Sequence, residues 1–420
     1  MKIFTKSIFR DWRLLLGLWL LLAVLAGLTK SSPHRCNNYI IFQSTYWHTL
    51  AEENLYDYNP DGVETYHLSP ALQISPLYKN YPTEYRDHNL YGPFFALLIM
   101  PFALHPHPVG LILWLVALTL SLFLAVRALP GRKGIQIFIY WFCAHELLTA
   151  LFMQQFNIAI AAILVGAFAL IEKEKEVWAT LLIMIGTFVK IYGLAGMAFF
   201  FFSKHKKRFL LYSLMWSVVL FCAPMLISSP EYVVGQYREW ALCIMDKNGM
   251  NSSSMMQNIS LLGFVHRTTG LVFSDLLLIV PGLLLFAAPY LRRKQWEHLP
   301  YRYAYLASSL LFVVLFSSGS ESSSYIIALT GVVVWYSSAP WKRGGWDLAL
   351  IIFAFILTSL SPSDLFPKVV RENYVWPYAL KALPCILVWF KLVIEMLTKD
   401  YVDPNDQREI VGGISHRPSL

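Results

Sequence analysis

Charged residues are scarce in this sequence. Asp, Glu, Lys and Arg make up 14% of its 420 residues, whereas soluble chains contain about a quarter. Hydrophobic residues make up 56%, and the mean hydropathy is +0.50. This composition excludes a soluble globular protein. The sequence also lacks a low-complexity tract, a soluble domain and an inverted repeat of the kind that transporters show.

Cysteine is rare as well, and the five cysteines show no metal-ligand spacing. Most of them lie in or beside apolar runs, which is typical of small core hydrophobes. The histidines form no cluster with metal-ligand spacing either. We therefore expect neither a metal nor a cofactor.

Apolar runs of membrane length recur along the chain, and a run must cross roughly 30 Å of hydrocarbon. They lie at about 12–29, 92–104, 108–129, 135–152, 155–171, 177–202, 208–228, 270–290, 301–318, 322–338, 345–361 and 376–397. The fold class predicted is all-α, a polytopic transmembrane helical bundle with a large external loop after the first helix. The first run is long for a secretory signal, so we interpret it as a retained helix.

The net charge of +8 needs no nucleic acid to explain it, because Lys and Arg gather in short connectors. Clusters at 204–208, 292–294 and 342–343 are predicted to be cytoplasmic. The connectors at 229–269, 318–322 and 362–375 then lie on the opposite face, together with a long polar segment at 30–92.

Two runs in the first half are unusual. The run at 93–104 is short and indicates a half-helix. The run at 177–202 is interrupted at Lys190–Gly193, which favours two short helices that meet at a polar break. This arrangement places 172–176 in the cytoplasm and gathers Gln155, Asn157 and Lys190 on the face of the large loop, where non-helical backbone lines a cavity.

The predicted domain organisation is one transmembrane domain over 1–399, with 30–92 as an external substrate loop. Residues 400–420 are polar and predicted to form a disordered cytoplasmic tail. The large loop combines several carboxylates with tyrosines, which suits a sugar. Asp87 stands out among its acids because it lies just before the chain re-enters the membrane at Pro93.

Lys190 and Glu321 are charged residues beside apolar sequence. A Lys buried in a membrane needs a partner, which indicates a phosphate or carboxylate ligand; the alternative is a side chain that reaches to the interface. Glu321 follows an apolar run, where it either caps the next helix or orients a substrate.

Polar residues at two predicted helix starts have two interpretations each. Gln155 and Asn157 are either helix caps or ligands. Asn258, Ser260 and Arg267 place a helix N-terminus near an Arg, which suits a phosphate; otherwise Arg267 is an ordinary residue at a membrane edge.

These pieces together resemble glycosyltransferase family 87, of the GT-C superfamily of membrane glycosyltransferases, especially its bacterial members from the Bacteroidetes. The resemblance runs from Asn37 to about Tyr336. Its pieces are NNYIIF, YGPFFALLIMPFAL, QFN at 155–157, ATLLIMIGTFVKIYG, NISLLGFVHR and ESSSYIIALTGVVVWY.

The resemblance implies a polyprenyl-phosphate sugar donor, an inverting transfer on the non-cytoplasmic face and a carboxylate base near the first external loop. Many members place an Asp shortly after the first helix, where this sequence has Asn37-Asn38. An amide cannot act as a base, so we predict Asp87 in that role. Ile259 also stands where the family pattern has Gln.

The sequence thus predicts a multi-pass inner-membrane hexosyltransferase that moves a sugar, with mannose as the candidate, from a polyprenyl phosphate to an extracytoplasmic lipid or glycan. Lys190 and Arg267 would bind the donor phosphate. Donor or acceptor would be oriented by Asn37, Asn38, Gln155, Asn157, Asn258, Ser260 and Glu321. The rivals are a catalytically silent relative and a flippase of lipid-linked sugars, which would need no large capping loop.

Overall fold

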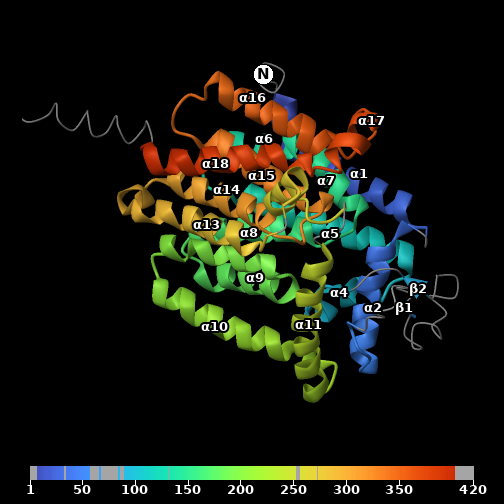
Figure 1. The fold of residues 1–420 in the computed structure, drawn as a ribbon. Helices are drawn as coiled ribbons and strands as arrows, with labels where there is room; N and C mark the ends of the chain where they lie inside the picture. The colour runs from blue at the N-terminus through green and yellow to red at the C-terminus, as the bar shows by residue number, and fades with distance from the viewer. Residues whose placement is uncertain are drawn as a thin grey trace, which may run out of the picture.

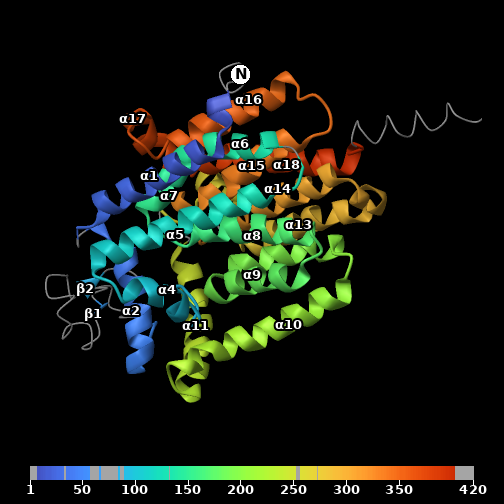
Figure 2. The same ribbon diagram turned by 180° about the vertical axis from the view of Figure 1, so that it is seen from behind.

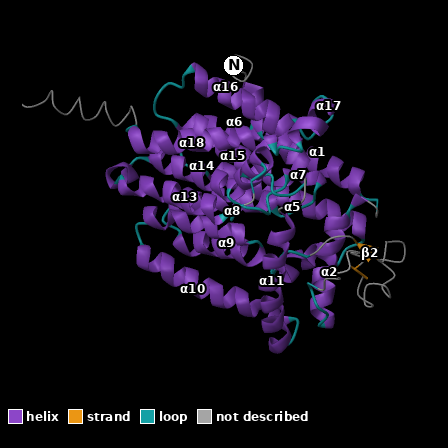
Figure 3. Cartoon of the chain, viewed as in Figure 1, coloured by secondary structure: helices purple, strands orange, loops and turns teal. Residues whose placement is uncertain are grey.

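The structure is a computed structural model that describes residues 7–32, 35–56, 66–67, 84–85, 89–131, 133–251, 256–271 and 273–402. Helices dominate it (Figure 3). Within these ranges the strands are β1 (Tyr66–His67) and β2 (Glu84–Tyr85), which pair antiparallel. The prediction of an all-α, polytopic membrane protein is confirmed.

Apart from the short η2, the helices of the first half follow the predicted apolar runs, with one addition. They are η2 (Ser7–Arg10), α1 (Trp12–Lys30), α2 (Asn37–Ala51), α4 (Phe95–Ala103), α5 (His107–Ala128), α6 (Lys133–Phe142), α7 (Ala144–Phe152), α8 (Asn157–Ile171), α9 (Glu176–Val189) and the 3₁₀-helix η5 (Ile191–Phe202). The addition is α2, inside the segment predicted as a loop.

The second half contains further helices, several of them followed by a short 3₁₀ or π segment. They are α10 (Lys206–Cys222), η6 (Ala223–Leu226), α11 (Pro230–Asn251), α12 (Leu261–Thr269), α13 (Leu276–Ala287), η7 (Ala288–Leu291), η8 (Arg293–Glu297), α14 (Leu299–Leu315), η9 (Ser322–Ser324), α15 (Tyr325–Ser338), α16 (Gly345–Phe353), η10 (Ala354–Leu360), α17 (Lys368–Val370), η11 (Arg371–Val375), η12 (Leu380–Ala382) and α18 (Leu383–Thr398).

Three helical stretches in the described ranges are long and apolar enough to cross a membrane: α1, α5 and the continuous Lys206–Leu226. The pair α6 and α7 also qualifies as one span with a 50° bend. Shorter apolar helices, among them α8, α9, η5 and α14, complete the bundle. The chain is therefore a membrane protein.

The helices form a layered bundle with α10 and α16 at opposite outer edges (Figures 1 and 2). α8 lies near the centre, packed against α5, α9, α14 and α15. Its sequence is apolar on every side, and almost all of its residues are buried, as expected for a helix surrounded by others. α11 and α2 instead cross one end of the bundle at a steep angle (Figure 1).

The segment 30–92 is not loop throughout, because its first part forms α2. The helix is largely buried although it carries Gln43, Ser44, Thr45 and Thr49. Its hydroxyls donate to carbonyls one turn back, as in Ser44 Oγ to Ile40 O at 2.9 Å, so burial leaves them satisfied. A helix that buries hydroxyls in this way looks like a polar loop in sequence.

The predicted connector at 229–269 is likewise mostly helical, since it contains α11 and α12. At the other end of the chain, the packed bundle extends past residue 399. The ring of Tyr401 is 2% exposed and packs against Tyr301 and Trp341. Residues 403–420 of the predicted tail lie outside the described residues.

Candidate active site

A tight helical hairpin carries Lys190 at its tip. α9 ends at Val189, Lys190 is extended, and η5 then runs back along α9. A Cβ added to Gly193 would lie 2.3 Å from the Gly186 carbonyl carbon, and one added to Gly196 would lie 2.6 Å from Ile183 Cγ1. Real Cβ atoms do not approach this closely, so the two helices pack at this distance because these positions are glycine.

The open end of the hairpin is closed by polar contacts. Ser203 Oγ donates to Glu176 Oε1 at 3.0 Å, and Lys204 Nζ pairs with Glu174 at 2.6 Å. The chain therefore enters and leaves the hairpin on one side, and Lys190 lies at the other. The prediction of two short helices that meet at a polar break is confirmed.

Four of the predicted site residues meet in one hydrogen-bonded cluster. Lys190 Nζ donates to Asn157 Oδ1 at 2.8 Å, and Asn157 Nδ2 donates to Gln155 Oε1 at 2.8 Å. Gln155 Nε2 in turn donates to Glu321 Oε2 at 2.7 Å. Ser323 adds hydrogen bonds to both amides. A chain of amides thus connects a half-buried cation to a carboxylate.

The turn before α8 positions this cluster against α2. Gln154 adopts a left-handed φ of 60° and is almost fully buried. Its Oε1 accepts the Tyr39 N–H at 3.1 Å, while Asn38 Nδ2 donates to the Met153 carbonyl at 2.8 Å. The start of α2 is thereby fixed beside Gln155. Gln154 was not among the predicted site residues.

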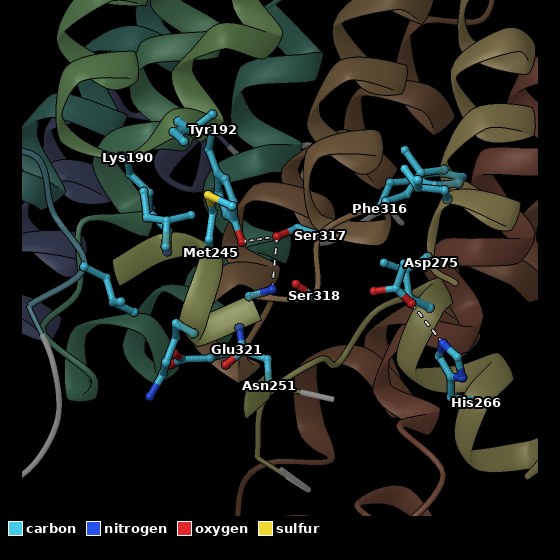
Figure 4. Close-up of a pocket in the computed structure, with 18 of the residues that line it drawn as sticks. Lys190, Tyr192, Met245, Asn251, His266, Asp275, Phe316, Ser317, Ser318 and Glu321 are labelled. Atoms are coloured by element: carbon cyan, nitrogen blue, oxygen red, sulfur yellow. Dashed lines mark hydrogen bonds and ion pairs between the residues drawn. The ribbon is translucent and has the colours of Figure 1, made fainter. Parts of the chain in front are cut away.

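A cavity of about 980 Å³ opens beside the cluster. Lys190, Gln155, Glu321 and Asn38 line it, and further walls come from the end of α11, from α12 and from the start of α13. Figure 4 looks into this cavity. Large apolar side chains also line it and remain exposed: Met245, Leu271 and Leu276. The cavity therefore combines a polar floor with an apolar rim.

Asn258 and Ser260 do not line the cavity, but they hold two elements of its wall in place: α12 and the connector before Glu321. Ser260 caps α12 by accepting the Gly263 N–H at 3.1 Å, and it donates to Asn258 Oδ1 at 2.6 Å. The intervening Ile259 N–H donates to the Ser320 carbonyl at 2.8 Å. This contact holds the connector that carries Glu321.

Arg267 and Asn37 are not brought into the cavity either. The Arg267 guanidinium donates to the Trp376 carbonyl at 3.2 Å and to the Gln257 carbonyl at 2.5 Å, so it ties α12 to neighbouring backbone. Asn37 begins α2. Asp87, the predicted base, lies outside the described residues.

Three further cavity residues were not predicted. Tyr192 lies beside Lys190, whose Nζ is 4.6 Å from the centre of the Tyr192 ring, and its hydroxyl is 2.7 Å from Ser317 Oγ. His266 and Asp275 face each other on another wall, with Nε2 and Oδ1 2.9 Å apart. Tyr192 lies within the predicted break at Lys190–Gly193, which was a usable signal. The His–Asp pair spans a helix boundary and left none.

No three His, Cys, Asp or Glu side chains that could hold a metal converge within the described ranges.

Comparison with known proteins gives one family. The model of glycosyltransferase family 87 matches residues 89–318, more than half of the chain. The match includes the hairpin, the amides Gln155 and Asn157 at the start of α8 and the His266–Asp275 pair, and it ends just before Glu321. A search of curated proteins finds no significant match.

Proposed function

Because this chain belongs to glycosyltransferase family 87, we propose that it moves a hexose from a polyprenyl-phosphate donor to a lipid or glycan acceptor with inversion. Glycosyltransferase activity follows from the family, and the membrane setting follows from the apolar helices. The donor class, the inversion and the acceptor are the proposal. A polyprenyl donor suits a cavity with apolar residues at its rim.

One observation carries the proposal: a half-buried Lys at the hairpin tip forms part of the cavity wall. An ammonium in a low-dielectric site needs negative charge or oriented dipoles around it. Asn157 accepts one of its hydrogen bonds, and an ammonium has three N–H donors. The remaining donors suit a donor phosphate, whose charge grows as the sugar leaves.

The active face would be extracytoplasmic, in an inner membrane. The hairpin tip lies opposite the side where Lys204 pairs with Glu174. The basic cluster 204–208 on that side supports a cytoplasmic location. The cavity, built around the tip, would then open to the periplasm.

The chemistry needs one base. The acceptor hydroxyl attacks the anomeric carbon while a carboxylate takes its proton, and the lipid phosphate leaves. A phosphate is acidic enough to leave without an acid catalyst. Asp87 remains the sequence-based prediction for that carboxylate, and Gln155, Asn157, Asn38 and Glu321 would orient the sugar.

The test uses purified full-length protein in lipid vesicles with radiolabelled polyprenyl-phosphate mannose, followed by a panel of other hexoses. Extracted membrane lipids and glycans serve as acceptors. Lys190→Met should weaken donor binding and lower transfer at least 100-fold, whereas Lys190→Arg should keep part of both. Lys204→Met, at the far end of the hairpin, is the matched control and should transfer normally.

A flippase would give a different result. Label would then cross the bilayer without appearing in a new product. Wild-type protein that moves label in this way, and never transfers it, would refute the glycosyltransferase proposal.

A further inference from the structure

The cavity has a second polar wall, formed by His266 near the end of α12 and Asp275 just before α13. Figure 4 shows this pair on the opposite side of the cavity from Lys190 and Tyr192, with Ser317 and Ser318 between them. The two walls therefore present different chemistry to one bound molecule.

The polar contacts of His266 fix the orientation of its ring. Nδ1 lies 3.0 Å from the Leu271 carbonyl oxygen, which can only accept, so Nδ1 carries a hydrogen. Nε2 lies 2.9 Å from Asp275 Oδ1, and the two groups form an ion pair when the ring is protonated. The ring is also stacked on Phe273, with centroids 4.2 Å apart. The imidazole is thus held on both nitrogens and on one face.

The Asp275 carboxylate has no other structural use in the described part of the chain. It precedes α13 but makes no capping hydrogen bond to it. Its recorded polar partner is His266, through Oδ1. In Figure 4 the second oxygen turns away from His266, toward the side of Ser318.

Glu321 is the other described carboxylate that lines the cavity, and it is less suited to act as a base. Its Oε2 accepts from Gln155, and its backbone N–H donates to Ser324 Oγ at 3.2 Å at the start of η9. It also belongs to the cluster of Lys190, where the donor phosphate is proposed to lie. In an inverting transfer the base must approach from the side opposite the leaving phosphate, which fits the wall of Asp275.

We propose that Asp275 is the catalytic base of this enzyme and that His266 is its positioning residue; this rests on the proposed function. Asp275 Oδ2 takes the proton of the acceptor hydroxyl as the O–H bond breaks. The acceptor oxygen forms the new bond to the anomeric carbon, and the bond to the phosphate oxygen breaks. The phosphate leaves with the electron pair, and Lys190 on the far wall stabilises its charge.

The test compares Asp275→Asn, Asp275→Glu and Asp87→Asn in the vesicle transfer assay with polyprenyl-phosphate mannose. Binding of the donor is measured separately with a photo-crosslinkable polyprenyl phosphate, and turnover is divided by the donor-competent protein, so a loss of folded protein does not count. Asp246→Asn, an exposed position on α11, is the matched control.

Asp275→Asn should bind the donor normally and lower turnover by a factor of about 10²–10⁴, the usual contribution of general base catalysis. Asp275→Glu should keep part of the turnover because it keeps a carboxylate. His266→Gln should lower kcat with little change in the KM for the donor, whereas a purely structural role would reduce the amount of donor-competent protein instead.

If wild type transfers the sugar and Asp275→Asn has normal turnover, the role of Asp275 as base is overturned and the proposed function stands. The same holds if Asp87→Asn abolishes turnover and Asp275→Asn does not. Wild-type protein that binds the donor and transfers nothing would overturn the proposed function, and this inference with it.

Discussion

A buried ion pair behind the site offers the sharpest test of how this bundle is stabilised. Lys381 Nζ lies 2.8 Å from Glu146 Oε1, and their side chains are 4% and 0% exposed. The ammonium also donates to the carbonyl and hydroxyl of Ser322 at 3.0 and 2.9 Å. Ser322 directly follows Glu321, so the pair anchors the connector that carries it.

Removing one partner of the ion pair should lower the stability of the protein far more than removing both. Lys381→Met leaves the Glu146 carboxylate buried without a counter-charge, and Glu146→Gln does the same to the ammonium. Each single change should cost about 3–5 kcal/mol of stability. The double variant removes both charges and keeps similar volumes, so it should regain most of that loss.

The measurement is the thermal midpoint of the detergent-solubilised full chain at one heating rate. Lys204→Met, which breaks the exposed pair with Glu174, is the control and should shift the midpoint little. A Lys381→Met midpoint equal to that of wild type would refute the reasoning. So would a double variant less stable than both single ones.

Two further predictions concern packing. Gly193→Ala should open the hairpin and lower both the thermal midpoint and donor binding, because its Cβ would meet the Gly186 backbone. Gly235→Ala is the control, since a Cβ there would meet no atom within 4 Å, and it should be neutral or slightly stabilising. Equal thermal midpoints for the two variants would argue against the hairpin geometry. Arg267→Gln should lower the midpoint through its two lost carbonyl contacts and leave donor binding per folded molecule unchanged; a selective loss of donor binding would restore Arg267 as a phosphate ligand.

Much of the fold was predictable because membrane-length apolar runs report helices directly. The break at Lys190 was visible too, since a charge between apolar runs is costly unless the chain turns there. α2 and α11 were not predicted. α2 satisfies its hydroxyls within the helix, and α11 crosses the end of the bundle, so neither shows the long apolar run that marks a span.

The site was predictable only where residues lie at helix starts that must converge. Gln155, Asn157, Lys190 and Glu321 meet because the segments that carry them end on the same side of the bundle. Direction within a helix was the missing information. Consecutive helical residues point about 100° apart, and in α12 this turns His266 into the cavity and Arg267 away from it.

Positions 37 and 38 carry amides where an acid was expected, and the structure gives a reason for the amide at Asn38. Its Nδ2 donates to the Met153 carbonyl at 2.8 Å, and that carbonyl belongs to the turn that sets Gln155 in place. An Asp at 38 would bring a carboxylate against a carbonyl, two acceptors with no hydrogen between them. The contact therefore requires a hydrogen-bond donor, which an ionised carboxylate is not. We infer that a chain that uses position 38 to hold this turn takes its base from another wall of the cavity. Asp275 is a described carboxylate on such a wall. The proposed base Asp275 would therefore replace the acid that is missing at positions 37–38.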